Sequence, residues 1–433
     1  MDREAWILVA FATLSSFAVS LILPYIPLFG REIGMPIALV GNLIFAYYAI
    51  EAVARIPIGS FSDATGYPLV IGAGAVSFVL AACAYLASIA VWEWLVLAQL
   101  ALGIGMSITY VTIPSYITVT DSSVPIYTFS VGFGWLLGPT TGGFLKDAFG
   151  MQIVFAAFLA VTLVLLVIAL AFARIGGGRE QTAAIAANGT ETPTGTTTAN
   201  GAATANGTAT ANGTRPHNPP AHPREVVSDL PAMTRSSFRD AFALLRTHDR
   251  ILLAALVSFI MFMNFAMANS LIPLRFSDVG LSSVTIGLLL TVRSATSTTV
   301  RLLTEKVLTV GRKATILVGL TALTGLVILG FAVAQSLPSL VALSVVWGLG
   351  GGLYLPVVFS LIADATAESE RGVAMGLRGT LGTAGSAIGV IVFMPLADLT
   401  SIVTSLLLFG AFVLAFAGGL GLYWQRHASR TSA

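Results

Sequence analysis

The chain alternates between long apolar runs and short polar segments from one end to the other. A helix crosses the hydrocarbon core of a membrane, about 30 Å thick, with about 20 residues. Twelve runs come close to this length, so the pattern predicts an all-α membrane protein with twelve transmembrane helices, the first retained rather than cleaved as a signal peptide. The predicted spans cover residues 6–28, 37–58, 69–89, 94–117, 126–145, 151–172, 251–272, 284–303, 314–334, 340–363, 373–396 and 402–424.

An internal repeat divides these spans into two groups of six. Residues 26–41 and 272–287 are closely similar and lie 246 positions apart. The matched positions are Ile26 with Ile272, Pro27 with Pro273, Leu28 with Leu274, acidic Glu32 with Asp278, Gly34 with Gly280, Gly41 with Gly287, and Arg55 with Arg301. Duplicated helix bundles are typical of membrane transporters, in which the two bundles rock about a site between them.

The composition of the chain indicates what surrounds these helices. The chain is 56% hydrophobic and 10% charged, whereas soluble domains carry about 25% charged residues. We therefore expect a lipid bilayer around it. The net charge of +2 does not favour a nucleic-acid partner. The single cysteine, Cys83, lies in an apolar run and is expected to be a small buried hydrophobe.

The segment between the two halves has a different composition. Residues 176–223 are mainly Ala, Thr, Gly, Asn and Pro, with too few apolar side chains to form a core. The expected domains are an N-terminal six-helix bundle over 1–175, a disordered cytoplasmic linker over 176–235, and a C-terminal unit over 236–433. This unit is expected to begin with an amphipathic interfacial helix over 236–250, before its own six-helix bundle.

The basic residues of the loops predict the orientation. Most lie on the side that carries both termini and the linker, while the opposite side has only Arg31, Lys146 and Arg275. Loops rich in Lys and Arg stay in the cytoplasm. We therefore expect a multi-pass protein of the cell membrane with both termini in the cytoplasm.

A glycine-rich string marks the fifth span. It reads G-x-x-x-G-P-x-x-G-G and comprises Gly134, Gly138, Pro139, Gly142 and Gly143. Glycines four residues apart line one helix face and permit close contact, expected here with the opposite half, while the proline permits a kink. Ordinary helix packing would account for the string. It also resembles the antiporter motif that drug:proton antiporters of the major facilitator superfamily carry in this span.

Two loops extend the resemblance to both halves, because each keeps part of the superfamily's G-x-x-x-D-x-x-G loop and the basic residues that follow it. The matching residues are Gly59, Asp63 and Gly66 in the first copy and Gly311, Arg312 and Lys313 in the second. The resemblance implies the major facilitator fold, with two six-helix repeat bundles. One departure is Gln99, which stands where the superfamily's antiporters often carry Arg in the fourth span.

Few ionisable residues lie at membrane depth, where they are costly and usually functional. Glu51 is the only acid well inside a span, and Arg55 follows at i+4 on the same helix face. One interpretation is an ion pair that neutralises both residues. The other makes Glu51 a proton-binding group that releases its proton when a cation approaches. Arg293 and Arg378 are the candidate cations, and the family fold favours Arg378 because it brings spans two and eleven together.

The resemblance also places a central cavity among spans one, four, seven and ten. Their polar and aromatic residues are therefore candidate cavity residues, or residues that merely satisfy helix packing. The candidates are Ser20, Thr109, Tyr110, Asn264, Asn269, Trp347 and Tyr354. Such a lining suits an uncharged, amphiphilic or anionic substrate.

These observations predict a secondary active transporter, a proton-coupled exporter of a small organic solute that works as a monomer. An importer of the same fold is the nearest alternative, and a non-transporting membrane sensor or scaffold is a third. No enzyme, cofactor or metal site is expected. The sequence has no G-x-x-x-x-G-K-[ST] phosphate loop, and its histidines, His217, His222, His248 and His427, lie in the linker or outside the predicted spans.

Overall fold

The computed structural model describes residues 3–119, 124–188, 245, 248–301, 313–366 and 371–431, which form helices joined by short connections. In the N-terminal half the helices are α1 (Arg3–Ile22), the 3₁₀ helix η1 (Leu23–Tyr25), α2 (Ile26–Glu32), α3 (Ile37–Thr65), α4 (Tyr67–Ala87), α5 (Trp94–Val119), α6 (Val124–Phe149) and α7 (Met151–Asn188). In the C-terminal half they are α9 (Asp249–Ala268), α10 (Leu271–Asp278), α11 (Ser283–Arg301), α13 (Lys313–Val333), α14 (Leu337–Ala365), α15 (Arg371–Leu399) and α16 (Ile402–Thr431).

The predicted all-α membrane architecture is confirmed. Ten helical stretches of the described residues are long and apolar enough to cross a membrane. The first predicted span corresponds to α1, η1 and α2 together, and the seventh to α9 and α10. The fifth and eighth correspond to α6 and α11, helices of 26 and 19 residues that fall short on hydropathy or charge. Of the twelve predicted crossings, these two are therefore the more polar ones.

The sequence repeat is also a repeat of structure. In both halves the first helix breaks before the repeated Ile-Pro-Leu and resumes as a short helix, α2 or α10. Each short helix is followed by a glycine with positive φ, 79° at Gly34 and 88° at Gly280. Only glycine adopts this conformation without a steric cost, so the repeated glycines end the two helices in the same way.

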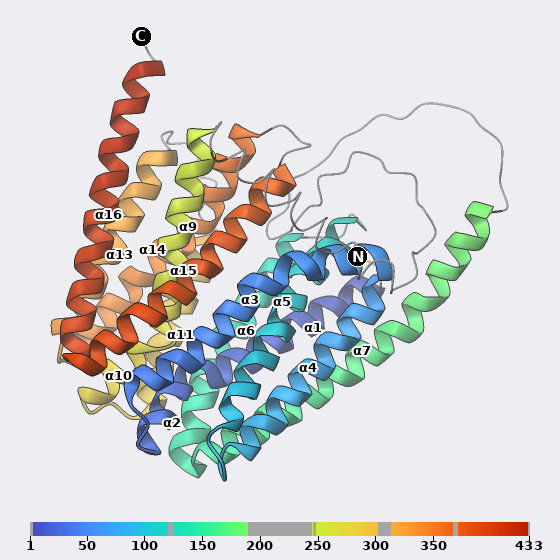
Figure 1. Cartoon of the computed structure of the whole chain (residues 1–433), viewed down its shortest axis with the longest axis horizontal. Helices are drawn as coiled ribbons and strands as arrows, with labels where there is room; N and C mark the ends of the chain where they lie inside the picture. Colours follow the sequence, from blue (N-terminus) through green and yellow to red (C-terminus); the bar gives the residue numbers. More distant parts are fainter. Residues whose placement is uncertain are drawn as a thin grey trace.

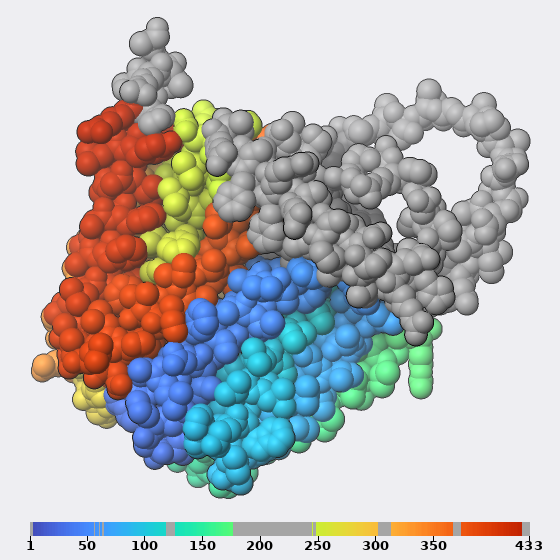
Figure 2. Space-filling model, in the orientation of Figure 1, coloured from blue at the N-terminus to red at the C-terminus, as the bar shows by residue number. Residues whose placement is uncertain are grey.

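In the part of the chain that the structure describes, the two halves meet mainly along two pairs of long helices. α3 packs along α15, and α6 packs along α11; the first pair is visible in the centre of Figure 1 and as the seam in Figure 2. Gly41 and Gly287, a matched pair of the repeat, allow these approaches. A Cβ at Gly41 would lie 2.5 Å from the Cβ of Met394, and one at Gly287 would lie 2.4 Å from the carbonyl oxygen of Pro139. The interface between the halves thus repeats the internal symmetry.

Both ends of the described chain point to one side of the molecule, while α2 and α10 lie at the other (Figure 1). We call the first the terminal side and the second, with the connections 33–36 and 279–282, the far side. α6 and α15 begin on the terminal side and run to the far side, whereas α3, α11 and α14 run the opposite way. A residue number along these helices therefore gives its depth.

One boundary differs from the sequence expectation, and another falls mostly outside the described residues. The linker was expected to start at residue 176, but α7 continues as a helix to Asn188, because the alanine-rich stretch after the glycines favours helix. Residues 189–235, and the expected interfacial helix apart from Leu245 and residues 248–250, lie outside the described residues.

The prediction for Cys83 was wrong, because its side chain is exposed on α4. In a membrane protein the exposed surface of a spanning helix faces lipid, so an apolar run does not distinguish a core position from a lipid-facing one.

Candidate functional site

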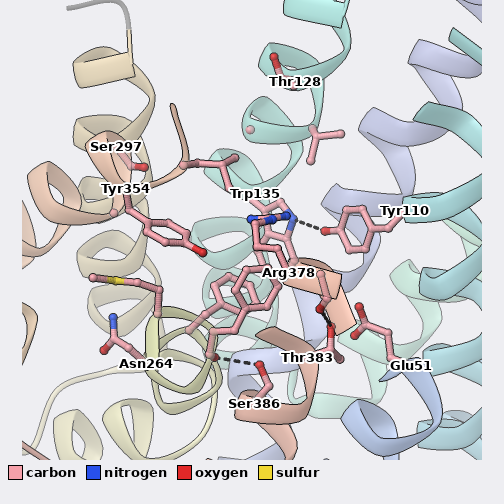
Figure 3. Close-up of a pocket in the computed structure, with 18 of the residues that line it drawn as sticks. Glu51, Tyr110, Thr128, Trp135, Asn264, Ser297, Tyr354, Arg378, Thr383 and Ser386 are labelled. Carbon is pink, nitrogen blue, oxygen red and sulfur yellow. Dashed lines mark hydrogen bonds between the residues drawn. The ribbon is translucent and has the colours of Figure 1, made fainter. Parts of the chain in front are cut away.

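A cavity of about 260 Å³ lies between the two halves. The N-terminal half contributes α3, α5 and α6, and the C-terminal half contributes α9, α11, α14 and α15 (Figure 3). The cavity residues of α6 lie in the first half of that helix, those of α15 in its first half and at its middle, and those of α11 in its second half. The cavity therefore lies at mid-depth and toward the terminal side. Its volume is just below the roughly 300–1,000 Å³ of typical small-molecule sites.

Among the described residues, the cavity lining holds one acid and four arginines. Glu51 and Arg55 form an ion pair within α3, and both side chains line the cavity, as do Arg293, Arg301 and Arg378. The structure therefore contains the ion pair of the first interpretation, in which Glu51 and Arg55 neutralise each other. Because a charge at this depth is costly without a partner, the surplus of cations is the main chemical feature of the site.

Aromatic rings lie against three of the arginines, and the first is Arg55, whose guanidinium is 5.6 Å from the centroid of Tyr110. The guanidinium of Arg293 lies over the ring of Trp347, 4.3 Å from its centroid, with Phe265 at 5.8 Å. The guanidinium of Arg378 lies 4.8 Å from the centroid of Phe359 and 5.7 Å from that of Phe262. Such cation–π contacts stabilise a guanidinium without neutralising its charge.

The structure brings three of the seven predicted cavity residues to the cavity. Tyr110, Asn264 and Tyr354 line it, and Trp135 donates a hydrogen bond from Nε1 to the Tyr110 hydroxyl at 3.1 Å (Figure 3). Trp347 is buried beneath Arg293 instead.

The other three predicted cavity residues are not among the lining residues. Each is buried and bonded to a backbone carbonyl. Ser20 donates to Gly134 at 3.1 Å, Thr109 to Gly105 at 3.0 Å, and Asn269 to Phe265 at 2.9 Å. Their placement in the cavity was therefore wrong, because short hydroxyl and amide side chains in these helices satisfy backbone groups nearby.

The glycine-rich string does not face the half that we expected. A Cβ at Gly134 would lie 2.4 Å from the carbonyl oxygen of Thr13, one at Gly138 would lie 1.8 Å from Oγ of Ser20, and one at Gly142 would lie 2.1 Å from the carbonyl oxygen of Leu21. All three partners belong to α1 of the same half. The expected contact of this face with the opposite half was thus wrong: the glycines bring α6 against α1.

Only the end of the string reaches across to the C-terminal half. A Cβ at Gly143 would lie 2.2 Å from the carbonyl oxygen of Ser283. The carbonyl of Pro139 accepts a hydrogen bond from the Tyr25 hydroxyl and also lies against Gly287. Pro139 and Gly143 therefore stand at a junction of η1, α6 and α11.

The loop motif is described in part. Gly59 is buried on α3, Asp63 lies in its last turn, and Gly66 turns the chain toward α4 with a φ of 91°. In the second copy, Gly311 and Arg312 lie outside the described residues, whereas Lys313 forms an ion pair with Asp364 of α14. The basic end of the second copy thus ties α13 to α14.

Two aspartates close the far side. Asp147, near the end of α6, accepts hydrogen bonds from the backbone N–H groups of Ser283 and Val284 at the start of α11, at 3.0 and 2.8 Å. Asp398, near the end of α15, accepts one from the N–H of Ile37 at the start of α3, at 3.0 Å. Each acid therefore caps a helix N-terminus of the opposite half.

One further ion pair reinforces this closure. Arg31 of α2 pairs with Asp278 of α10 at 2.6 Å across the two halves, whereas Lys146 pairs with Glu32 within the N-terminal half. Partial burial alone would raise the pKa of Asp147, but the hydrogen bonds from Val284 and Ser283 outweigh it and lower that pKa. The ionised form of Asp147 is thus the one that holds the far side closed.

The sequence of the chain matches a model of a known protein family. The model described as Major Facilitator Superfamily matches residues 7–199 and 254–432, most of both halves. The chain belongs to the major facilitator superfamily. The family and the fold are those of transporters rather than enzymes, and the described residues contain no cluster of three or more His, Cys, Asp or Glu that could hold a metal ion.

Solved structures of this superfamily's fold extend over nearly the whole chain. The human organic anion transporter MFSD10 (TETRAN) matches with a TM-score of 0.60 and 15% identity, covering 97% of this chain and 100% of that one. A POT family transporter in complex with 5-aminolevulinic acid matches with a TM-score of 0.68 and 11% identity, covering 97% and 95%. At these identities the likeness shows the fold alone.

Curated relatives match over a shorter region. The multi-drug resistance efflux pump PmrA of two Streptococcus pneumoniae strains is 29% identical over 157 residues, which is 33% of this chain. The match spans 38% of the relative's length.

Sequence reasoning missed several residues that the structure brings forward. The repeat matched Arg301 with Arg55, yet Arg301 was not a candidate cavity residue, and neither were Ser297 and Trp135. A usable signal was the polar face of the eighth span, on which Arg293, Ser297 and Arg301 are four residues apart. For Asp147 and Asp398 the signal was an acid at the far end of spans five and eleven.

Proposed function

We propose that this member of the major facilitator superfamily moves a small organic solute across the cell membrane by alternating access, with export coupled to inward movement of protons. The observation that carries the proposal is the cavity between the two repeated halves, which is lined by charged residues at mid-depth, while Asp147 and Asp398 tie the halves together on the far side. Rocking of one bundle against the other would expose the same cavity to the opposite side. Both walls of the cavity come from a single chain, so the proposed transporting unit is a monomer.

Two resemblances support export. The string at Gly134 to Gly143 is similar to the motif of drug:proton antiporters, and the partial relative is a multi-drug efflux pump. Glu51 is the proposed proton-binding group, since it is the one acid of the described cavity lining. A proton on Glu51 would release Arg55 from its ion pair, which links protonation to a change of contacts in the cavity.

Import by the same cycle is the second candidate. It is favoured by Gln99, a buried amide at the place where antiporters of the superfamily often carry Arg. Without that cation, the proton site of an antiporter is incomplete at this place.

Purified protein in sealed liposomes tests the proposal and separates the two directions. With a pH gradient imposed in either sense, a panel of labelled small solutes is expected to show saturable flux that reverses with the gradient and collapses when a protonophore is added. Solute moving against the proton flow supports export, and solute moving with it supports import. Flux that is indifferent to the gradient for every solute would contradict proton coupling.

The proposed orientation has its own test. In a Cys83→Ala background, a cysteine at Ser339, next to the far-side start of α14, is expected to react with a membrane-impermeant thiol reagent added to intact cells. A cysteine at Thr204, in the sequence between the halves, is expected to react only after permeabilisation, because basic segments stay in the cytoplasm. The reverse pattern would place both termini outside the cell.

A further inference from the structure

The two repeats carry different charges on the same helix face of the cavity. In the N-terminal half, α3 presents Tyr47, Glu51 and Arg55 at four-residue spacing, and the offset of 246 places Arg293, Ser297 and Arg301 of α11 at the matching positions. All six residues line the cavity. The acid of the first half is thus replaced by a serine in the second, while a second arginine is added.

The matched arginines occupy equivalent places in the fold. Nη1 of Arg55 lies 3.3 Å from where a Cβ of Gly379 on α15 would be, and Nη1 of Arg301 lies 3.8 Å from where a Cβ of Gly132 on α6 would be. Each arginine therefore reaches from its own half onto a glycine of the opposite half. Their surroundings differ in the acid, because Arg55 has Glu51 beside it, and also in the ring of Tyr110, whose centroid lies 5.6 Å from the guanidinium of Arg55.

The arginines of α11 have no acidic partner among the residues that the structure describes. Arg55 pairs with Glu51, whereas Arg293 is held over Trp347 and Phe265 by its flat face. Nε of Arg301 is buried without a hydrogen-bond partner, as is Nε of Arg55, but Arg55 has the Glu51 carboxylate beside its guanidinium. A guanidinium away from water is costly until an anion accepts its hydrogen bonds. This face of α11 thus presents two arginines and lacks the acceptor that the matching face of α3 contains.

We infer that the substrate is a small organic anion, and that its carboxylate or similar oxyanion group binds beside Ser297, between Arg293 and Arg301. The inference rests on the proposed transport function. At 1.5 Å of rise per residue, each arginine is about 6 Å along the helix from Ser297, within reach of its long side chain. The substrate's anion then takes the place that the Glu51 carboxylate fills in the first half, and the guanidinium fork matches its two oxygens.

Aromatic side chains beside this place select the rest of the substrate. Trp135 of α6 packs edge-on against Phe265 of α9, with ring centroids 5.0 Å apart; both line the cavity, and Phe265 lies next to Arg293. Flat apolar surfaces of this kind hold an apolar or aromatic body. The substrate class is therefore a small anion with such a body, rather than a sugar-like or cationic solute.

The experimental test introduces a carboxylate at Ser297, the position at which the second half lacks the acid of the first. Binding of phenylacetate to the detergent-solubilised protein is followed by tryptophan fluorescence, with phenylacetamide and 2-phenylethylammonium as the neutral and cationic analogues. The wild-type protein is expected to bind phenylacetate at least tenfold more tightly than either analogue. Ser297→Glu is expected to weaken phenylacetate binding at least tenfold, because the new carboxylate pairs with Arg293 and Arg301 at i−4 and i+4. Ser297→Gln, which has the same size without the charge, is expected to weaken it less than threefold.

The possible results separate the anion-site inference from the proposed transport function. Equal losses in Ser297→Glu and Ser297→Gln, with unchanged melting temperatures, would mean that size rather than charge matters there and would overturn the inference. So would a wild-type protein that does not bind phenylacetate or that prefers the cation. Gradient-driven flux of a cationic solute alone would keep the transport proposal and remove the anion site. Charge-dependent binding of phenylacetate without flux of any solute would keep the anion site and contradict the transport proposal.

Discussion

Replacing Asp147 and Asp398 together with alanine is expected to open the far side of the protein. Each carboxylate caps a helix N-terminus of the opposite half, Asp147 at the start of α11 and Asp398 at the start of α3. Loss of a cap costs about 1 kcal/mol, so the double substitution should shift the equilibrium between closed and open far sides by about 2 kcal/mol, roughly 30-fold. Either single substitution should give a smaller shift in the same direction.

Pulsed electron paramagnetic resonance measures this shift. Spin labels at Val91 and Gln335, exposed positions of the far side in the two halves, should report a longer distance in the double variant, in a Cys83→Ala background. The Asn variants at both positions are the matched control, because an amide oxygen still caps a helix. If the alanine and wild-type distances coincide, the caps do not hold the halves together.

The pKa of Asp147 sets the pH dependence of this closure. Its hydrogen bonds in the closed form lower that pKa below the ordinary value of an aspartate, about 3.9. The contribution to closure is therefore complete above that value and is lost as the pH falls through the lowered pKa. Labelled wild-type protein should keep its closed far side at neutral pH and begin to open only below about pH 4.

The elements of the fold could be predicted because lipid imposes a simple rule on sequence. A spanning helix needs about 20 apolar residues, and the resulting runs predict α4, α5 and α14 within a few residues of their observed ends. The repeat was predictable for a local reason: Gly34 and Gly280 end their helices with positive φ, and no other residue type does so without a steric cost.

The direction in which each helix faces could not be predicted in the same way. In a soluble helix the polar face marks the solvent, but here lipid and protein interior are both apolar. The sequence therefore did not distinguish the exposed Cys83 from a core position, or show that Gly138 lies against α1 rather than the opposite half. The end of α7 was missed for a different reason, since helices continue into water wherever composition permits.

In the candidate site, the sequence predicted cavity-lining charged residues more reliably than neutral polar ones. A charged residue inside a span has few reasons to exist other than function, and the four nominated ones, Glu51, Arg55, Arg293 and Arg378, all line one cavity. A serine, threonine or asparagine can satisfy a neighbouring carbonyl, as Ser20 does with Gly134, so its presence carries little information. The capping role of Asp147 depends on the start of α11, 136 positions later in the chain.

Glu51→Gln is expected to abolish flux driven by a pH gradient while exchange of substrate across the membrane continues, because exchange needs no net proton movement. The carboxylate of Glu51 is buried and pairs with Arg55. Removing one partner of a buried ion pair costs about 3–5 kcal/mol, whereas replacing both partners with neutral residues of similar size costs little. Glu51→Gln should therefore also lower the melting temperature, and Arg55→Met in the same chain should restore it.

The double variant separates the two roles that Glu51 can have. If Glu51 carries the proton, Glu51→Gln/Arg55→Met is a stable protein that exchanges substrate and remains uncoupled, since stability is restored and the titrating group is not. If Glu51 serves only to neutralise Arg55, coupling returns together with stability, and the proton site must be sought elsewhere. Glu32→Gln/Lys146→Met is the matched control, because it removes an ion pair outside the cavity and should leave coupling intact. Coupled flux in the Glu51 and Arg55 double variant would overturn the assignment of Glu51 as the proton carrier.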